Sequence, residues 1–295
     1  MSTSKIDKKG PNLKWGYITR SGEFAIPPRF DEAESFSNGQ AYVSIGDAQY
    51  VIDRTGQVIK QLHPEEPEPD YEEIPWEESW AAVRAPRRHV LDPKWKLVIV
   101  SRVVSAEGLV RANVGGKPDD FGLAWGGRWG YVDQNNRFVI EPVFTGALDF
   151  SDGLAAVAVG GKQDEMGCVR GGKWGYINAE GKFVAEPQFS RACTFSEGLA
   201  AVIVGGRFKK YWHWHDTSQT GTWGFVDRTG KLAVAPQFEW VDNEFHEGLV
   251  RVVLGGKYGY LDNTGNYAIK PQFAWAWRFS EGLAAVAVEA VEVSQ

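Results

Sequence analysis

The sequence contains only two cysteines, Cys168 and Cys193, and no stretch approaches the run of about 18 apolar residues that a transmembrane helix needs. Two thiols exclude a disulfide framework, and their spacing is not that of a zinc site. The first nine residues hold no apolar segment of the kind found in signal peptides. We therefore expect a soluble, cytoplasmic protein with no membrane insertion.

The sequence also has no excess of basic residues and no catalytic signature. A net charge of −6 gives no electrostatic reason to expect a nucleic-acid partner. There is no Gly-x-Ser-x-Gly elbow, no phosphate-binding loop and no His-Glu-x-x-His motif. The Gly-Gly-Lys tripeptides at 115–117, 160–162 and 255–257 recur as strand connectors and do not open a helix. These absences predict a protein that is not an enzyme and needs no cofactor.

What the chain does contain is one motif repeated along its length. Each copy has Trp-Gly, an aromatic residue, a hydrophobic residue and Asp or Asn, then a Gly turn and a run ending in Pro-x-Phe. Glu/Asp-Gly-Leu and an Ala/Val-rich run follow. The clearest copies begin at Trp15, Trp129, Trp174, Trp223 and Tyr258. The gap between the first two leaves room for two more copies, found in weaker form at 50–59 and 89–99. The total is seven hairpins.

These motifs resemble those of the bacterial WG-repeat family, also called the KWG-repeat family. The resemblance extends over nearly the whole chain, although the second and third copies, between about residues 35 and 110, depart from the pattern. It implies a repeat architecture but no particular activity.

Within a repeat the hydrophobic period is two, which predicts strands. We name them strand A (for example 153–159), strand B (Trp-Gly) and strand C (for example 182–185). Strand A is apolar on both faces and should be buried. Strands B and C should form a hairpin about a type I turn with a left-handed Gly, as at 227–230. Strand C is expected to end at Pro187, and 189–195 to form a short fourth strand or an irregular edge.

Repeats of this kind predict an all-β fold of tandem three- or four-stranded antiparallel meanders. The chain begins at a strand B and ends with a surplus strand A at 282–288, so the two could complete one sheet. We therefore predict a closed, β-propeller-like ring of seven repeats; the alternative is an open or partly closed β-hairpin solenoid. The array should span 14–289, with an N-terminal extension at 1–13 and a C-terminal tail at 290–295.

Extra residues enter mostly between strands A and B, at 118–126, 163–171 and 208–221. Insertions at one equivalent turn should project from one face of an array, which is often the binding face. Aromatic and charged residues there are the candidate contacts. They are Asp119, Asp120, Phe121, Trp125, Asp164, Glu165, Met166, Arg207, Lys209, Lys210, Tyr211, Trp212, His213, Trp214, His215 and Asp216.

The sequence thus predicts a non-catalytic scaffold that binds a protein or peptide through these loops. A second interpretation is a glycan or small-ligand module in which Trp125, Tyr211, Trp212 and Trp214 stack on sugars. A remote third is a hydrolase, which would rest on the His213-x-His215-Asp216 cluster alone; two further ligands would be needed for zinc, so no metal site is predicted. The acidic tract at 65–70, with Glu72, Glu73, Glu77 and Glu78, is expected to be a solvated rim; the alternative is a docking strip for a basic partner.

Overall fold

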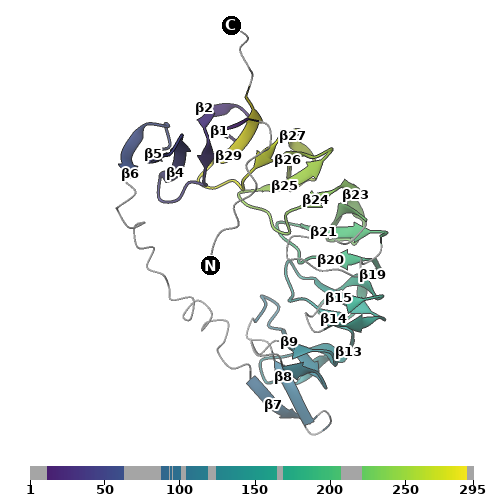
Figure 1. The fold of residues 1–295 in the computed structure, drawn as a ribbon. Helices are drawn as coiled ribbons and strands as arrows, with labels where there is room; N and C mark the ends of the chain where they lie inside the picture. Colours follow the sequence, from purple (N-terminus) through teal and green to yellow (C-terminus); the bar gives the residue numbers. More distant parts are fainter. Residues whose placement is uncertain are drawn as a thin grey trace. The chain divides into compact units, whose positions relative to one another are not determined.

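The computed structural model describes residues 12–62, 88–92, 94, 96–100, 104–118, 124–164, 169–206 and 221–290. Every regular element in these residues is a β-strand, which confirms the predicted all-β class. The strands form antiparallel sheets of four or five strands and two short ribbons (Figure 1). They divide between two compact units, unit 1 within 1–69 and 239–295, and unit 2 within 70–238. Among the described residues there is no helix with the length and apolar character needed to cross a bilayer.

Unit 1 holds three sheets, each in the order short strand, A, B, C. One sheet comprises β28 (Trp275–Ala276), β29 (Ala284–Glu289), β1 (Leu13–Ile18) and β2 (Phe24–Phe30). The next comprises β3 (Glu32–Ala33), β4 (Gln40–Ile45), β5 (Ala48–Asp53) and β6 (Val58–Leu62). The third comprises β24 (Trp240–Val241), β25 (Leu249–Leu254), β26 (Lys257–Asp262) and β27 (Tyr267–Phe273).

Unit 2 contains two sheets in the same order and one that is larger. The two are β14 (Gly146–Ala147), β15 (Ala155–Val159), β18 (Lys173–Ile177) and β19 (Phe183–Phe189), and β20 (Arg191–Ala192), β21 (Leu199–Val204), β22 (Thr222–Asp227) and β23 (Leu232–Phe238). The larger sheet has β7 (Arg88–Asp92), β8 (Lys96–Val100), β9 (Val110–Val114), β12 (Arg128–Val132) and β13 (Phe138–Phe144). The ribbons pair β10 (Lys117–Pro118) with β11 (Ala124–Trp125), and β16 (Lys162–Gln163) with β17 (Val169–Arg170).

All seven predicted B–C hairpins are present among the described strands. The third, β7–β8, does not stand in a sheet of its own there. Instead β8 pairs with β9 and takes the place that the short strand has elsewhere. The predicted fourth strand is confirmed as this short strand, for example Arg191–Ala192, which pairs with strand A of the following repeat.

Strands from the two ends of the chain share one sheet. β1 pairs along its whole length with β29, and Trp15 lies opposite Ala287. This confirms that the last strand A completes the sheet of the first hairpin. A closed ring and an open solenoid differ in how the remaining sheets connect. That connection includes residues 63–87, which lie outside the described part of the chain, so both stay predictions, as does the single array from 14 to 289.

The prediction that strand C ends at Pro187 is wrong, because β19 continues through this proline to Phe189. Trp174 lies opposite Phe189 and Tyr176 opposite Ala185, so a step of two residues along strand B matches a step of four along strand C. The extra residues form a bulge that brings strand C against Gly175. A Cβ on Gly175 would lie 2.5 Å from the Ala185 carbonyl oxygen, which explains the glycine after the tryptophan. Proline is tolerated because strand C is an edge strand and needs no amide there.

The B–C turns have the predicted geometry. Gly230 donates its N–H to the Asp227 carbonyl at 2.9 Å and has a φ of 79°. The Asp227 carboxylate accepts hydrogen bonds from the Thr229 hydroxyl at 2.6 Å and from the Thr229 and Lys231 amides at 2.8 and 3.2 Å. The Thr229 hydroxyl bond is the main reason that the pKa of Asp227 is lowered. The repeated Asp therefore stabilises a turn, as expected.

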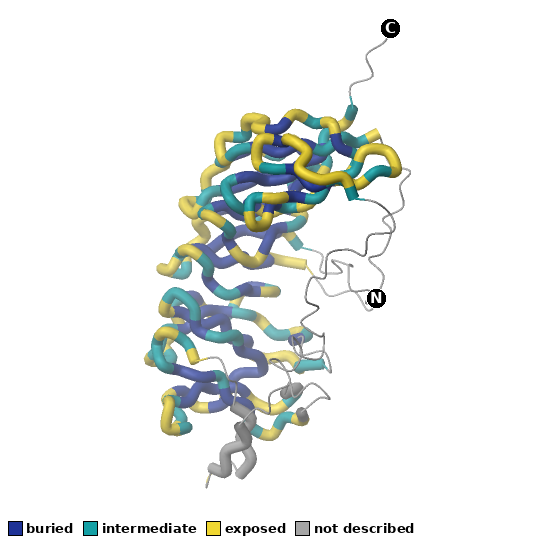
Figure 2. Tube along the Cα trace, turned by 90° about the vertical axis from the view of Figure 1, so that its left-hand side faces the viewer, coloured by how far each residue is buried: buried dark blue, intermediate teal, exposed yellow. Residues whose placement is uncertain are grey.

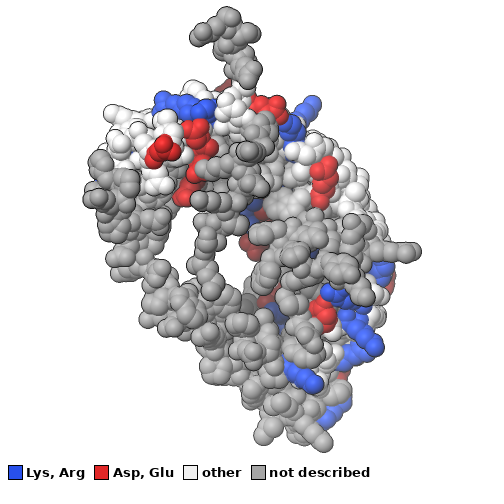
Figure 3. Space-filling model, in the orientation of Figure 1, with Lys and Arg blue, Asp and Glu red and all other residues white. Residues whose placement is uncertain are grey.

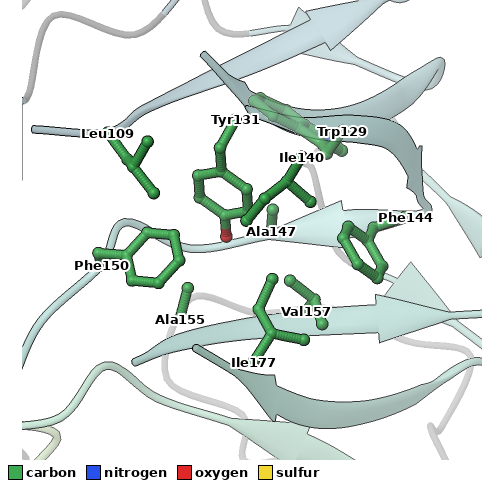
Figure 4. Packing of buried hydrophobic residues seen from close by; sticks show 10 residues of the cluster. All are labelled: Leu109, Trp129, Tyr131, Ile140, Phe144, Ala147, Phe150, Ala155, Val157 and Ile177. Atoms are coloured by element: carbon green, nitrogen blue, oxygen red, sulfur yellow. The ribbon is translucent and has the colours of Figure 1, made fainter. Parts of the chain in front are cut away.

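Buried residues follow the middle of the strands, and exposed ones gather at the turns (Figure 2). On the face shown in Figure 3, basic and acidic side chains of the described residues are both present. In unit 2, Tyr131 and Ile140 of one sheet face Val157 and Ile177 of the next (Figure 4). The hydrophobic core therefore lies between neighbouring sheets, and each sheet depends on the next one for burial.

In four repeats the aromatic residue after the strand B glycine is a tyrosine whose hydroxyl bonds to the backbone next to the short strand of the neighbouring sheet. Tyr131 is fully buried and its hydroxyl donates to the Leu148 carbonyl at 2.7 Å, and Tyr176 bonds in the same way to Cys193 at 2.8 Å. Tyr17 and Tyr260 make the equivalent bonds in unit 1. Burial raises the pKa of Cys193 to about 11, so this thiol is protonated at neutral pH and fills the core.

Acidic residues of the Glu/Asp-Gly-Leu motif link one sheet to the next. In four repeats the carboxylate accepts a hydrogen bond from the backbone N–H of the glycine at the equivalent place in the neighbouring repeat. The pairs are Glu107 with Gly153, Asp152 with Gly198, Glu247 with Gly282, and Glu281 with Gly39, at 2.7–3.0 Å. We call each such junction a seam.

Candidate functional site

The turn from strand A to strand B lies at the end of each sheet opposite the B–C turn. The seams bring the starts of neighbouring A strands together. The ends of these strands, and the A–B turns that follow them, therefore lie along the opposite edge of the stacked sheets within a unit. We call this the A–B edge. The A and B strands that flank the three long insertions all belong to unit 2, so each insertion leaves its sheet and returns to it at the A–B edge of that unit.

Two of these insertions begin as paired ribbons. Lys117 lies opposite Trp125 in β10–β11, and Lys162 lies opposite Arg170 in β16–β17. The ribbons come directly after strand A and directly before strand B of their repeats, and so extend from the sheet edge. Residues 118–126 and 163–171 are therefore attached through hydrogen-bonded stems.

Side chains at the base of the second ribbon brace it. Asp164 pairs with Arg170, with 2.7 Å between Oδ2 and Nε. The indole N–H of Trp129 donates to the Gln163 side-chain oxygen at 3.2 Å, across from the preceding sheet. Asp164 was predicted to contact a ligand; in the structure it contacts Arg170, and a binding role stays a prediction.

The base of the first ribbon is organised by a buried amide. Asn113 is fully buried. Its Nδ2 donates to the Gly126 carbonyl at 2.9 Å, and its Oδ1 accepts from the Gly116 N–H at 3.0 Å. One side chain thus ties together the two strands where the chain leaves the sheet and returns.

Most other predicted contact residues lie outside the described residues. Trp125 falls in β11. The predicted contact residues that lie outside the described residues are Asp119, Asp120, Phe121, Glu165, Met166, Arg207, Lys209, Lys210, Tyr211, Trp212, His213, Trp214, His215 and Asp216. In the described ranges, no group of three His, Cys, Asp or Glu is arranged to hold a metal ion.

In unit 1 the A–B turns are short and are held by acidic side chains. The carboxylate of Glu239 accepts from the N–H groups of Gly255 and Gly256 at 2.9 and 3.2 Å. The Asp31 carboxylate accepts from the Gly46 N–H at 2.7 Å. Both acids directly follow Pro-x-Phe, so this position braces the A–B turn.

The A–B edge of unit 1 carries an aromatic cluster that the sequence analysis missed. Trp240 and Tyr258 lie in one sheet with ring centroids 6.4 Å apart, and Trp275 of the next sheet is 5.0 Å from Tyr258. Trp275 is 36% exposed and the other two are partly buried. Partial burial is the main reason that the pKa of Tyr258 is raised, so its hydroxyl is neutral near pH 7. The missed signal is a Trp two residues after Pro-x-Phe, in only two repeats.

A buried ion pair supports this cluster. Arg251 donates to the Asp242 carboxylate through Nε at 2.7 Å and Nη2 at 3.0 Å, and to the Ala276 carbonyl at 2.6 Å. Its guanidinium also lies 5.3 Å from the centre of the Trp240 ring. The half-exposed Arg278 reaches the same carboxylate at 3.3 Å. A cation–π contact with the guanidinium of Arg251, which Asp242 and the Ala276 carbonyl fix in place, therefore stabilises the Trp240 ring.

The repeated sheets, seams and Gly–Pro bulges define a tandem β-repeat protein. The family described as WG containing repeat matches residues 15–47, 129–162, 174–208, 223–258 and 258–289, which is more than half of the chain. The chain belongs to this WG-repeat family. No curated protein matches the sequence significantly.

Several solved structures resemble the chain weakly. The WD40 domain of Neurospora crassa Pan2 is 10% identical, with 96% of this chain and 87% of that chain covered and a TM-score of 0.31. A eukaryotic initiation factor is 11% identical, with 89% of this chain covered and a TM-score of 0.30. This chain spans only 63% of that protein chain, which is less than two thirds of its length. An uncharacterized protein of Listeria monocytogenes is 10% identical, with 90% and 79% covered and a TM-score of 0.29. At these TM-scores the similarities carry no argument about this chain.

Proposed function

We propose that the protein is a non-catalytic β-repeat scaffold that binds a protein or peptide through the loops on the A–B edge of unit 2. The observation that carries the proposal is that all three long insertions fall on this one edge, in three successive sheets. The seams and tyrosine bonds between those sheets fix the spacing of the loop bases.

The stems support the same proposal. Asn113 and the Asp164–Arg170 pair hold the loop bases in place, which lowers the entropy that a loop loses when it binds. The sequences carried by the stems combine aromatic and charged residues, as protein-binding surfaces do. A scaffold of this kind needs no reactive group.

Deletion of residues 207–221 tests the proposal. It joins Gly206 to Thr222 and so recreates the short turn that the last repeat has at Gly255-Gly256-Lys257. A photo-crosslinking residue in the 163–171 loop should capture a partner in cells, and the deletion should weaken that capture while the melting temperature is kept. The matched control moves the crosslinker to the exposed Glu180 in a B–C turn. Equal capture from Glu180, or capture that the deletion leaves unchanged, would contradict the proposal.

Glycan binding is a second candidate, favoured by the aromatic cluster on the A–B edge of unit 1. Exposed Trp and Tyr rings present flat apolar surface with polar atoms at their rims, which suits stacking against a sugar ring. Trp275→Ala should abolish a glycan-array signal and the ligand-induced change in tryptophan fluorescence. Trp277→Ala is the control, because Trp277 is similarly exposed, at 40%, two residues away. Wild-type protein that gives no signal in either assay would remove this candidate.

A further inference from the structure

The A–B edge of unit 2 is basic, although the chain as a whole carries a net charge of −6. The described turns and strand ends at this edge hold six basic residues but only one acid, Asp164, which already pairs with Arg170. The insertion residues outside the described part add three basic and four acidic residues, so the sequence of this edge keeps a positive excess. The turns and strand ends counted here are 114–117, 124–129, 145–147, 158–164, 169–174, 189–192, 203–206 and 221–223.

Four of these cations have no carboxylate partner among the described residues. They are Arg128, Lys162, Lys173 and Arg191, and each is exposed. The guanidinium of Arg191 lies 5.7 Å from the centre of the Trp223 ring, which is a contact that leaves its charge in place. We call these four residues the basic strip.

An equivalent cation in unit 1 is neutralised within its own repeat. Lys14 directly precedes the tryptophan of its strand B, and its Nζ donates to the Asp31 carboxylate at 2.7 Å. Asp31 is the residue that directly follows Pro-x-Phe. In unit 2, Lys173 stands where Lys14 does, and its Nζ donates to the Ser190 hydroxyl at 3.4 Å. A serine therefore occupies the place of the aspartate, and the charge of Lys173 is not compensated.

The same replacement occurs in the preceding repeat. Arg128 precedes the tryptophan of its strand B, and the residue after its Pro-x-Phe is Thr145. The Thr145 hydroxyl donates to the Gly160 carbonyl at 2.7 Å, as the Ser190 hydroxyl does to a glycine carbonyl of the next A–B turn at 2.6 Å. These hydroxyls brace the turns as the unit 1 acids do, but they carry no charge. Unit 2 thus keeps the brace and gives up the acid.

Contacts between the first two sheets of unit 2 bring two members of the basic strip together. The Trp129 indole N–H donates to the Gln163 side chain at 3.2 Å. Arg128 directly precedes this tryptophan, and Lys162 directly precedes this glutamine. Both cations therefore lie on the same part of the edge.

The other two members continue the strip. Lys173 contacts Ser190, the residue before Arg191. Lys173 also lies opposite Val159, after which a two-glycine turn leads to Lys162. The four cations therefore follow one another along the edge of three successive sheets.

Apolar side chains lie beside the basic strip. Val159, opposite Lys173, is 45% exposed, and Val204, at the end of the next strand A, is 37% exposed. Apolar surface next to uncompensated cations suits a protein segment that carries both acidic and apolar side chains. A nucleic acid offers phosphates without apolar side chains, and the net charge of −6 repels a long polyanion. An acidic protein segment therefore fits this edge better than a nucleic acid.

We propose that the basic strip binds an acidic segment of the partner protein, in which Asp or Glu side chains are interspersed with apolar ones. The inference rests on the proposed function and names the chemistry of the partner. Complementary charges would steer the segment to the edge and set its register between the loop bases.

A phage-displayed library of random peptides, panned on the full chain at low salt, supplies the probes. Enriched peptides should be rich in Asp and Glu, and their affinity, measured by fluorescence anisotropy, should fall about tenfold between about 0.05 and 0.5 M NaCl. Lys173→Glu should weaken binding by about fivefold or more, because repulsion replaces attraction. Lys182→Glu is the matched control: Lys182 is exposed in the same repeat but lies at the B–C turn, so affinity should stay at the wild-type value.

Ser190→Asp tests the basic strip without removing a cation. It recreates beside Lys173 the acid that Asp31 supplies to Lys14, so affinity for the peptides should fall by about threefold or more while the melting temperature is kept. Asp31→Ser in unit 1 is the control, and it should leave the affinity unchanged. If Ser190→Asp does not fold, Lys173→Glu decides the question.

The proposal is overturned if no peptide is enriched, if the enriched peptides lack an excess of Asp and Glu, or if correctly folded Lys173→Glu binds them normally. Tighter binding of a labelled single-stranded DNA, lost in Lys173→Glu, would overturn it too, since a nucleic acid would then occupy the strip. Non-acidic peptides that lose affinity in the 207–221 deletion would reject the acidic partner alone and support the binding scaffold. Failure of the crosslinking experiment would instead reject the proposed function.

Discussion

The carboxylate of Glu281 accepts a hydrogen bond from the backbone N–H of Gly39 at 2.9 Å, although the two residues are 242 positions apart. Glu281 has a φ of 54°, a left-handed conformation that non-glycine residues rarely adopt. Asp152 and Glu247 have the same conformation and bond to the next glycine in the same way. The Glu/Asp-Gly-Leu motif is therefore a junction between sheets as well as the start of strand A.

Removal of one seam carboxylate should reduce stability. We expect Glu281→Ala to lower the free energy of unfolding by about 1 kcal/mol, because a charge-assisted hydrogen bond is lost at a partly buried site. Urea denaturation measures the change. The control is Glu289→Ala, since Glu289 forms an exposed ion pair with Lys257, and pairs of that kind contribute little. Equal losses in the two variants would show that the seam hydrogen bond contributes no more to stability than an exposed ion pair.

The glycine after the tryptophan should be among the least replaceable residues. Gly175→Ala places a Cβ 2.5 Å from a carbonyl oxygen of strand C, and we expect a loss of about 3 kcal/mol. Gly153→Ala separates this clash from backbone strain: nothing lies within 4 Å of its Cβ position, but its φ is 83°. That variant should lose only about 1 kcal/mol. Thermal or chemical unfolding that ranks the two in reverse would refute the bulge as the reason for the glycine.

The sequence predicts best what is encoded locally. Strand B, the turn at 227–230 and the start of strand C all follow from residues within one hairpin, so their order and turn type were correct. The expectation that strand C ends at Pro187 is wrong because proline interrupts pairing in a central strand, whereas β19 is an outer strand with a bulge. The surplus strand A was paired correctly with β1, since repeats with an incomplete first copy and an extra last strand complement each other.

The contacts between repeats could not be predicted from the sequence. Asp152 bonds to Gly198, 46 residues further on, and nothing in the local sequence distinguishes it from a turn residue. Trp240 and Trp275 lie outside both the Trp-Gly motif and the three insertions, so neither sequence criterion selects them. Only the stacking of two sheets brings Tyr258 between them. The inserted loops were found by comparing repeat lengths, and their bases do share one edge of unit 2.

Buried tyrosines should control stability at high pH. Burial raises the pKa of Tyr17, Tyr131, Tyr176 and Tyr260 above the usual value of about 10. A raised pKa in the folded state contributes stability that is complete below the pKa of the unfolded chain and is lost as the pH rises through the folded value. We therefore expect alkaline unfolding above about pH 10, with tyrosinate absorbance from these residues appearing together with the loss of circular dichroism. Ionisation of all tyrosines near pH 10 in a protein that is still folded would contradict this.

The ion pair behind the aromatic cluster should be the most sensitive charged contact of unit 1. Asp242→Ala leaves the nearly buried guanidinium of Arg251 without its main partner, because Arg278 is also cationic and cannot replace the carboxylate. We expect a loss of about 3 kcal/mol, together with a change in tryptophan fluorescence, since Trp240 lies over Arg251. Asp149→Ala is the matched control: its partner Arg111 is more exposed, so the loss should be about 1 kcal/mol.

Replacing both Asp242 and Arg251 with apolar residues should restore part of the stability lost in Asp242→Ala, because no unpaired charge then remains. If the loss in the double variant equals the sum of the losses in the Asp242 and Arg251 single variants, the two side chains are not coupled. The aromatic cluster then does not depend on their pairing.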